Sequence, residues 1–414
     1  MRFHRVLARA VGVGQAVVES VRADASGMVI VVRPHARAAS RCGVCRRVCP
    51  GFDQGRGEVR RWRVLDVGVL RCYAEAAVVR VSCPRHGVVV ESVPWARHRA
   101  GHARVFDQQV AWLATRKSKT AVVQLMRISW ATVGAIIARV TADADAVAGD
   151  RLDGLTRIGV DEVSYKRHHK YLTVVVDHHT RRVVWLAEGR SKATLAGFFE
   201  LLGPDRCGQI DLVSADGADW IFHAVQDHCP RAKICLDPFH VVAWAVRAVD
   251  DVRRRVWNQL RRAGDKAMAK LVKDARFAVW KNPENLTDRQ QVRLADIAEV
   301  NKPLYRAYLL KEHLREVFAK RGQDGALLLR SWLRWAARSK VEEFVDLARR
   351  IRLYFQPDIL NTLHHGLSNG LIESTNTKIR LLTRMAFGFK SADALIALAK
   401  LHLGGYQIEL PGRS

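Results

Sequence analysis

Three acidic residues in this sequence have the types and spacing that metal-dependent phosphoryl transfer requires. Asp161 lies in RIGVDEVSYK and Asp216 in IDLVSADGADW, both in or after apolar, strand-like runs, whereas Glu373 opens a helix-like segment, SNGLIESTNTKIR. Two Mg²⁺ ions about 3.5–4 Å apart, held by oxygen ligands, can stabilise both the attacking and the leaving oxygen of a phosphodiester. The sequence therefore predicts that Asp161, Asp216 and Glu373 hold Mg²⁺ or Mn²⁺.

Other carboxylates compete for these positions. Glu162 could replace Asp161, because adjacent strand residues point to opposite faces. Asp177 also ends an apolar run and could lie near the metals. Asp237, in CLDPFH, ends another apolar run and competes with Asp216 for the role of second metal ligand. An isolated Asp after a strand is commonly a turn residue, so each assignment depends on how the strands lie together.

The charge of the chain indicates its partner. The 414 residues include 68 Lys+Arg and 41 Asp+Glu, a formal net charge of +27. Such a surface attracts phosphate backbones by releasing condensed counterions, which favours double-stranded DNA as the partner. The alternatives are a basic surface that serves solubility, or association with ribosomes. No apolar run reaches the roughly 18 residues that would suggest a membrane span, so we expect no membrane partner and a soluble, cytoplasmic protein.

Residues 1–103 show short apolar alternations separated by Gly, Pro and Cys, which predicts a small β-rich module. Two knuckle-like pairs, CGVC and CPRH, lie about forty residues apart, a spacing that suits a structural Zn²⁺ site. Cys49 and Cys72 are possible substitutes, and unliganded thiols are the alternative. The predicted zinc ligands are Cys42, Cys45, Cys83 and His86.

Residues 104–145 change to helical periodicity. KTAVVQLMRISWATVGAIIARV predicts a helix, a tight turn with Ser129 as N-cap, and a second helix. Val122, Val123, Leu125 and Met126 are expected to line the first helix, and Val133, Ile136 and Ile137 the second. The pattern resembles a helix-turn-helix that presents Thr132 and Arg139 to DNA. Any three-helix bundle has the same periodicity.

The next segment predicts an α/β domain. Residues 155–240 follow the order β-β-β-α-β-α-β, which matches the first part of a ribonuclease-H-like catalytic domain. In such a sheet the first and fourth strands are adjacent, which would bring Asp161 and Asp216 together. Residues 241–363 predict an all-α insertion, and residues 364–414 the second part of the catalytic domain with the glutamate helix. The fold class is therefore multidomain α/β.

Tryptophans in the predicted insertion have two interpretations. Core packing is the simpler one, because they recur within amphipathic helical stretches. Stacking on a flipped-out base near a cleavage site is the alternative. The residues concerned are Trp257, Trp280, Trp332 and Trp335.

The order of these motifs resembles a known family. Seven motifs follow one another along nearly the whole chain: CxxC…CxxH, a helix-turn-helix, GVDE, SADG, LDPFH, a helical insertion and GLIESTNTKIRLLTRMAFGF. This order is similar to that of the DDE transposases of bacterial insertion sequences, specifically the ISL-three type. One variation is that the second zinc pair is Cys-x-x-His rather than Cys-x-x-Cys, which is compatible with zinc.

The resemblance implies roles for further residues. The catalytic glutamate of this family lies in an Asn-Gly-x-x-Glu-x-x-Asn pattern, which matches Asn369, Gly370, Glu373 and Asn376 here and implies supporting roles for Asn369 and Asn376. The resemblance also implies that Asp237 and His240 support the active site or the DNA. Separately, basic residues near Glu373 could bind phosphates that flank the cut, or form a solvated face. These are Lys378, Arg380 and Arg384.

The resemblance implies cutting and joining of DNA at the ends of an insertion sequence. The N-terminal modules would bind the terminal inverted repeats, and the acidic site would catalyse both phosphoryl transfers. Because two DNA ends must be joined, we expect at least a homodimer on DNA. A non-catalytic DNA-binding regulator and a structure-specific nuclease of the same fold are the alternatives.

Overall fold

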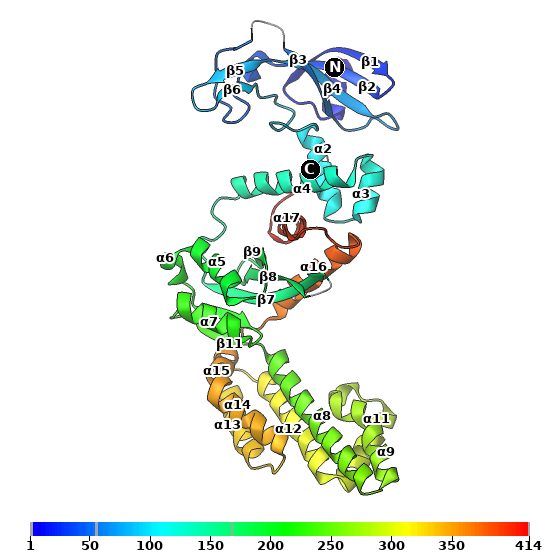
Figure 1. Cartoon of the computed structure of the whole chain (residues 1–414), viewed down its shortest axis with the longest axis vertical. Helices are drawn as coiled ribbons and strands as arrows, with labels where there is room; N and C mark the ends of the chain where they lie inside the picture. Colours follow the sequence, from blue (N-terminus) through cyan, green and yellow to red (C-terminus); the bar gives the residue numbers. More distant parts are fainter. Residues whose placement is uncertain (1–2, 54–56, 167–168, 413–414) are drawn as a thin grey trace. The chain divides into compact units, whose positions relative to one another are not determined.

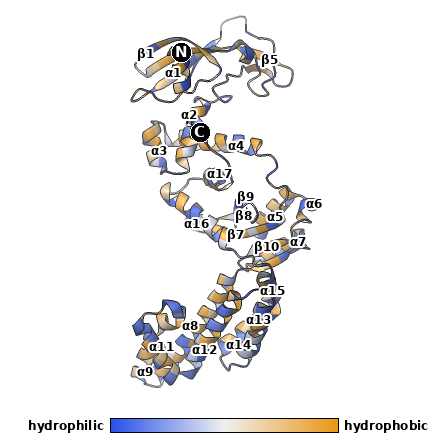
Figure 2. Ribbon diagram, turned by 180° about the vertical axis from the view of Figure 1, so that it is seen from behind, coloured by the Kyte–Doolittle hydropathy of each residue, from blue (hydrophilic) through white to orange (hydrophobic). Residues whose placement is uncertain are grey.

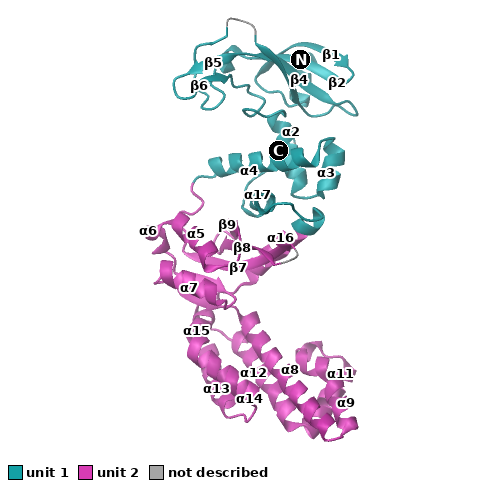
Figure 3. Ribbon diagram, in the orientation of Figure 1, with its two compact units in different colours: residues 1–149, 382–414 teal, residues 150–381 magenta. Residues whose placement is uncertain are grey.

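The protein forms two compact units in the computed structural model, which describes residues 3–53, 57–166 and 169–412. One unit comprises residues 1–149 and 382–414, and the other comprises residues 150–381 (Figure 3). The sequence suggested that residues 364–414 belong together. In the structure, residues 382–414 belong to the same compact unit as residues 1–149.

The N-terminal part of the first unit is rich in strands, as its alternating pattern predicted (Figure 1). Its elements are α1 (Phe3–Ala10), β1 (Ala16–Asp24), β2 (Gly27–Pro34), η1 (Ala36–Ala38), β3 (Glu58–Arg63), β4 (Cys72–Val78), β5 (Arg80–Cys83) and β6 (Gly87–Val90). Four strands form a sheet in the order β1-β2-β4-β3, and β5 and β6 form a separate antiparallel hairpin. The hairpin carries the second predicted zinc knuckle.

Three helices follow the strands: α2 (Arg104–Ala114), α3 (Lys119–Met126) and α4 (Trp130–Val147). The Ser129 side chain caps α4 by accepting a hydrogen bond from the Thr132 backbone N–H at 3.1 Å, as predicted. Val122 and Ile136 are buried, but Leu125 is 63% exposed, so its predicted place in the helix core was wrong. Helix α17 (Ala392–Leu403) packs against α4, where Thr141 Oγ1 donates to the Ala397 carbonyl at 3.1 Å.

Among the residues that the structure describes, no single helix is long and apolar enough to cross a membrane. Helices α3 and α4 meet that test only as a pair bent by 100°.

The second unit contains a five-stranded mixed sheet. Its elements are β7 (Arg157–Lys166), β8 (Lys170–Asp177), β9 (Arg182–Glu188), α5 (Lys192–Leu202), α6 (Pro204–Cys207), β10 (Leu212–Ala215), α7 (Asp219–His228) and β11 (Lys233–Leu236). The strand order is β11-β10-β7-β8-β9; β7, β8 and β9 are antiparallel, and β10 is parallel to both β7 and β11. The order of elements along the chain is therefore the one that the sequence predicted.

Helices fill the chain between β11 and the glutamate segment. They are α8 (Pro238–Arg262), α9 (Lys266–Asp274), α10 (Arg276–Trp280), η2 (Pro283–Asn285), α11 (Asp288–Val300), α12 (Lys302–Ala319), α13 (Gly322–Ala337), α14 (Glu342–Arg350), the π-helical η3 (Ile351–Phe355) and α15 (Gln356–His365). Helix α16 (Gly370–Met385) follows. Hydrophobic and hydrophilic residues alternate along the helices (Figure 2), so each can turn an apolar stripe toward a shared core.

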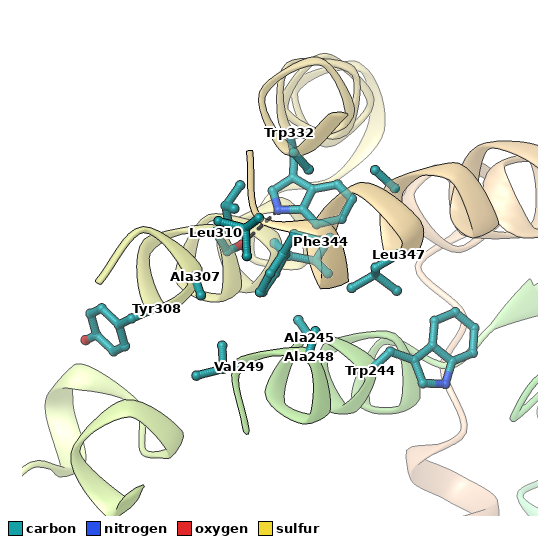
Figure 4. Close-up of a cluster of buried hydrophobic side chains, with 14 of the residues drawn as sticks. Trp244, Ala245, Ala248, Val249, Ala307, Tyr308, Leu310, Trp332, Phe344 and Leu347 are labelled. Atoms are coloured by element: carbon teal, nitrogen blue, oxygen red, sulfur yellow. Dashed lines mark hydrogen bonds between the residues drawn. The ribbon is translucent and has the colours of Figure 1, made fainter. Parts of the chain in front are cut away.

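Trp332 lies at the centre of this helical core (Figure 4). It is fully buried, and its indole N–H donates to the Leu310 carbonyl at 2.8 Å. Phe344 and Ala245 belong to the same core cluster. Trp332 therefore has the predicted packing role, whereas Trp257, Trp280 and Trp335 are only partly buried at the edge of the core.

Replacing Trp332 with Ala should lower the free energy of unfolding by about 3–5 kcal/mol, because a large cavity forms and the Leu310 carbonyl loses its donor. Chemical denaturation followed by circular dichroism would measure the loss. Trp335→Ala is the matched control, since this indole is partly exposed and should cost less. Equal losses for the two variants would contradict the central role of Trp332.

Candidate functional site

Three parallel strands bring three aspartates to one edge of the sheet. Ser214 of β10 is in register with Gly159 of β7, and Ala215 is in register with Leu236 of β11. Continuing these registers puts Asp216 opposite Asp161 on one side and opposite Asp237 on the other. Asp216 and Asp237 each come directly after their strand, which leaves these carboxylates at the carboxyl ends of the strands.

Asp161, Glu162 and Asp216 form one cluster, with one carboxylate oxygen from each within 4.8 Å of the others. Asp161 Oδ2 accepts a hydrogen bond from Asn376 Nδ2 at 2.9 Å, and its Oδ1 accepts from the Glu162 backbone N–H at 2.7 Å. Glu162 was considered only as a replacement for Asp161, yet both carboxylates lie in this cluster. Glu162 is also paired with Arg190 at 2.9 Å.

Glu373 lies in a second cluster, with Asp237 and His240, again with ligand atoms within 4.8 Å of one another. His240 Nδ1 is 3.0 Å from Asp237 Oδ2, and the Asn369 backbone N–H donates to Asp237 Oδ1 at 3.2 Å. The sequence grouped Glu373 with Asp161 and Asp216; the structure places it directly beside Asp237 and His240.

Helix α16 connects the two clusters, because Glu373 lies in one and Asn376, a turn later, bonds to Asp161 in the other. The negative charges of Asp216 and Asp161 also act on His240. Its pKa is raised first by the hydrogen bond to Asp237 and then by these two carboxylates. The supporting positions implied for Asn369, Asn376, Asp237 and His240 are therefore all close to the acidic residues.

Asp177 does not belong to either cluster. It is buried, and it accepts hydrogen bonds from the backbone N–H groups of His179 and Thr180 at 2.9 and 3.1 Å. Its carboxylate therefore has the turn-forming role that an isolated Asp after a strand commonly has.

The negative charge of the first cluster is only partly compensated, by Arg190. Burial, together with the charges of Asp216 and Glu162, raises the pKa of Asp161 to about 7, although the hydrogen bond from the Glu162 backbone N–H acts in the opposite direction. Burial and Asp216 also raise the pKa of Glu162, despite Arg190. Two buried oxygens, Asn376 Oδ1 and Glu162 Oε2, have no hydrogen-bond partner among the described residues. Crowded carboxylates with unpartnered oxygens suit a hard divalent cation such as Mg²⁺ or Mn²⁺.

Asp161→Asn should stabilise the metal-free protein at pH 8 by about 2 kcal/mol, after allowance for partial solvent screening. The folded pKa of Asp161 is about 7 and its ordinary value is 3.8, so the folded protein binds this proton more tightly. Stability of the wild type is therefore lost as pH rises from about 4 through 7. Asp161→Asn has no carboxyl group at this position and therefore does not lose stability in this way. The difference in stability between the variant and the wild type should vanish near pH 4.

Thermal unfolding at several pH values would check this expectation. Asp177→Asn is the matched control, because it removes a buried carboxylate whose hydrogen bonds are satisfied, and it should destabilise the protein at pH 8. A destabilised Asp161→Asn protein at pH 8 would contradict the charge crowding inferred for the cluster.

The four predicted zinc ligands come together in the first unit. Cys42, Cys45, Cys83 and His86 place one ligand atom each within 4.8 Å of the others. The Cys45 and Cys83 sulfurs are 3.7 Å apart, and His86 Nδ1 lies 3.6 Å from the sulfurs of both Cys42 and Cys83. Tetrahedral zinc with bonds of about 2.3 Å to S and about 2.05 Å to N separates two sulfurs by about 3.75 Å, and sulfur from nitrogen by about 3.55 Å. The residues therefore fit zinc.

The alternative thiols lie outside this cluster. Cys49 Sγ donates to the Arg47 carbonyl at 3.3 Å, and Cys72 Sγ donates to the Leu70 carbonyl at 3.5 Å. Although burial acts in the opposite direction, hydrogen bonds from Arg85 and His86 lower the pKa of Cys83 to about 6, which favours the thiolate that a metal requires.

The predicted DNA-binding residues differ in their surroundings. Lys378, Arg380 and Arg384 are exposed on α16. Thr132 is half-buried in the first turn of α4, where its hydroxyl is 2.9 Å from that of Ser129. Arg139, expected to face outward, points its guanidinium at the buried Asp107, 3.4 Å away. Arg97 pairs with the same carboxylate at 2.9 Å.

Sequence reasoning missed Arg190, which compensates part of the charge on Glu162. It follows β9, far from Glu162 along the chain, and no local pattern distinguishes it from other surface arginines. Asp107 was missed as well, because a single acidic residue in an amphipathic helix gives no sign that it will be buried.

Comparison with known proteins identifies the family. Residues 158–399 match a family described as transposase, and residues 91–141 match the helix-turn-helix domain of transposase family ISL3. The chain is 53% identical over 409 residues to the transposase for insertion sequence element IS1557 of Mycobacterium tuberculosis, covering 94% of this chain and 91% of that protein. It is 29% identical over 376 residues to the transposase for IS1001 of Bordetella parapertussis, covering 88% of each. The chain therefore belongs to the ISL3 family of insertion-sequence transposases.

Proposed function

We propose that this protein cuts DNA at the ends of an insertion sequence and joins the freed 3′ ends to target DNA. The observation that carries the proposal is the pair of acidic clusters at one edge of the sheet, connected by α16, which contributes Glu373 to one cluster and the Asn376 hydrogen bond to the other. The strand order and directions support a ribonuclease-H-like catalytic domain, with α8–α15 as its insertion. Fold similarity alone would not fix the activity, but the carboxylates favour it.

Asp161, Asp216 and Glu373 would hold the divalent cations, Mg²⁺ or Mn²⁺, which when bound stabilise charge on the attacking and leaving oxygens. Asn376 holds the Asp161 carboxylate in place through its 2.9 Å hydrogen bond. The Asn369 backbone N–H and His240 fix both oxygens of Asp237, which therefore acts as a positioning residue beside Glu373. Exposed Lys378, Arg380 and Arg384 would contact phosphates near the cut.

The first unit would recognise the terminal inverted repeats. The helix-turn-helix supports this role, with Thr132 near the start of the second helix. Because Arg139 is paired with Asp107, we assign it to holding the helices together rather than to primary DNA contact. The Cys42–Cys45–Cys83–His86 cluster would hold a structural Zn²⁺. The protein would act in the bacterial cytoplasm, as at least a dimer on DNA.

The test combines the purified chain with Mg²⁺, DNA that carries the element's ends, and a target plasmid. Wild type should produce nicks at the ends and joined products, and Glu373→Gln should produce neither while it still binds the ends. Glu342→Gln, an exposed glutamate on α14, is the matched control and should keep activity.

The alternatives give different results in the same test. Binding without any cleavage by the wild type would indicate a regulator. Cleavage that follows branched structure rather than end sequence would indicate a nuclease. Joining by Glu373→Gln at the wild-type rate would contradict the assignment of Glu373.

A further inference from the structure

A pocket in the helical part of the second unit has no role in the function proposed above. The pocket has a volume of about 730 Å³ and is lined by residues from the end of α8, the α9–α10 segment and the start of α11. It belongs entirely to the second unit, and none of the residues that line it is a member of the acidic clusters.

The charges that line this pocket are strongly unbalanced. Asp274 is the acidic residue of the lining, against six Lys or Arg side chains. Arg253 and Arg254 are paired with Asp250, and Arg293 lies 4.0 Å from Asp296. The other three have no carboxylate within 4.0 Å among the described residues. These unpaired cations are Lys273, Arg276 and Arg289, and all three are exposed.

Aromatic rings accompany the unpaired cations. Phe277 is 55% exposed although it is a large apolar side chain, and it lines the pocket together with the half-buried Trp257. The Arg276 guanidinium lies 4.1 Å from the centroid of the Trp280 ring and 5.7 Å from that of the Phe277 ring. An exposed aromatic ring and unpaired cations are the two components with which proteins bind unpaired nucleotides, since the ring stacks on a base and the cations contact phosphates.

We propose that this pocket binds single-stranded DNA, with Lys273, Arg276 and Arg289 contacting phosphates and Phe277 stacking on an unpaired base. Duplex DNA would contact the cations through its phosphates but would not stack on the Phe277 ring, because its bases are already stacked on one another. The inference rests on the proposed function only for the source of the strand, since base pairs beside a cut open more readily than those of an intact duplex.

The test measures binding of a labelled oligo(dT) strand to the full chain, without added Mg²⁺, over a range of salt concentrations. Replacing Lys273, Arg276 and Arg289 together by Ala should reduce the slope of log K against log salt by about 2, because each lost phosphate contact on a single strand contributes about 0.7. The matched control replaces three exposed arginines by Ala, namely Arg330 and Arg334 of α13 and Arg338 directly after it, and should leave the slope unchanged.

Phe277→Ala separates stacking from charge. It should weaken binding of oligo(dT) about tenfold and leave duplex binding unchanged, because only unpaired bases stack on the ring. If Phe277→Ala binds the single strand like wild type, or if the pocket and α13 triple variants behave alike, the inference is overturned. Because binding needs no catalysis, a failure of DNA cleavage in the assay above would leave this result interpretable.

Discussion

Asp216→Asn should reduce both end cleavage and strand joining by about a thousandfold or more, while binding of the DNA ends persists. The Asp216 carboxylate lies between Asp161 on one neighbouring strand and the position of Asp237 on the other. A metal-bound carboxylate here contributes several kcal/mol of transition-state stabilisation, and each 1.36 kcal/mol corresponds to about tenfold in rate. Losing one negative charge should not weaken the attraction between the protein and DNA phosphates.

Single-turnover cleavage of end-containing DNA would measure the loss, and a mobility-shift assay would measure binding. Asp219→Asn is the matched control, because this exposed aspartate lies three residues later, in the first turn of α7, and outside both clusters. We expect it to cleave at a rate close to that of wild type. If Asp216→Asn retained a tenth of the wild-type rate, Asp216 would not be a principal ligand.

The sheet and its acidic edge could be predicted from sequence because their signals are local. Apolar runs of strand length end at Asp216 and Asp237, and parallel neighbours must bring such ends together. The spacing of Glu373 and Asn376 on one helix likewise placed both side chains on one face. Periodicity could not predict which carboxylates lie close enough together to bind the same metal ion. The pairing of Glu373 with Asp237 and His240 depends on where α16 crosses the sheet, and no local pattern records that.

Other differences arise from partners that are distant in sequence. Arg139 occupies a helical position that periodicity leaves outward, but buried Asp107 draws its guanidinium inward. Helix α17 has an apolar stripe that predicts burial, but the stripe alone does not predict that the helix packs against α4. In both cases the sequence indicates that a side chain or a helix face needs a partner. Which partner it contacts depends on the tertiary fold.

Cys83→Ala should remove zinc from the protein and unfold the β5–β6 hairpin. Among the described residues, the small core at this metal cluster is Cys42, Cys49, Val81 and Cys83, two of which are the proposed ligands themselves, with Val89 packed against them. So small a core cannot offset the entropy of ordering the chain, whereas a structural zinc ion contributes about 10–16 kcal/mol in small zinc-binding modules. Zinc content should fall from one ion per chain to none, and amide hydrogens of β5 and β6 should exchange rapidly.

Cys49→Ser is the control that isolates the metal from the thiol. Cys49 is as buried as Cys83 and belongs to the same small core, but its sulfur bonds to the Arg47 carbonyl and is not one of the four clustered ligands. A serine hydroxyl can make the same hydrogen bond, so this variant should keep one zinc ion per chain and slow exchange in the hairpin. If Cys49→Ser lost zinc and Cys83→Ala kept it, Cys49 rather than Cys83 would be the zinc ligand. Zinc loss in Cys83→Ala alone would mean that the metal, rather than the apolar packing of the thiols, holds the hairpin in place.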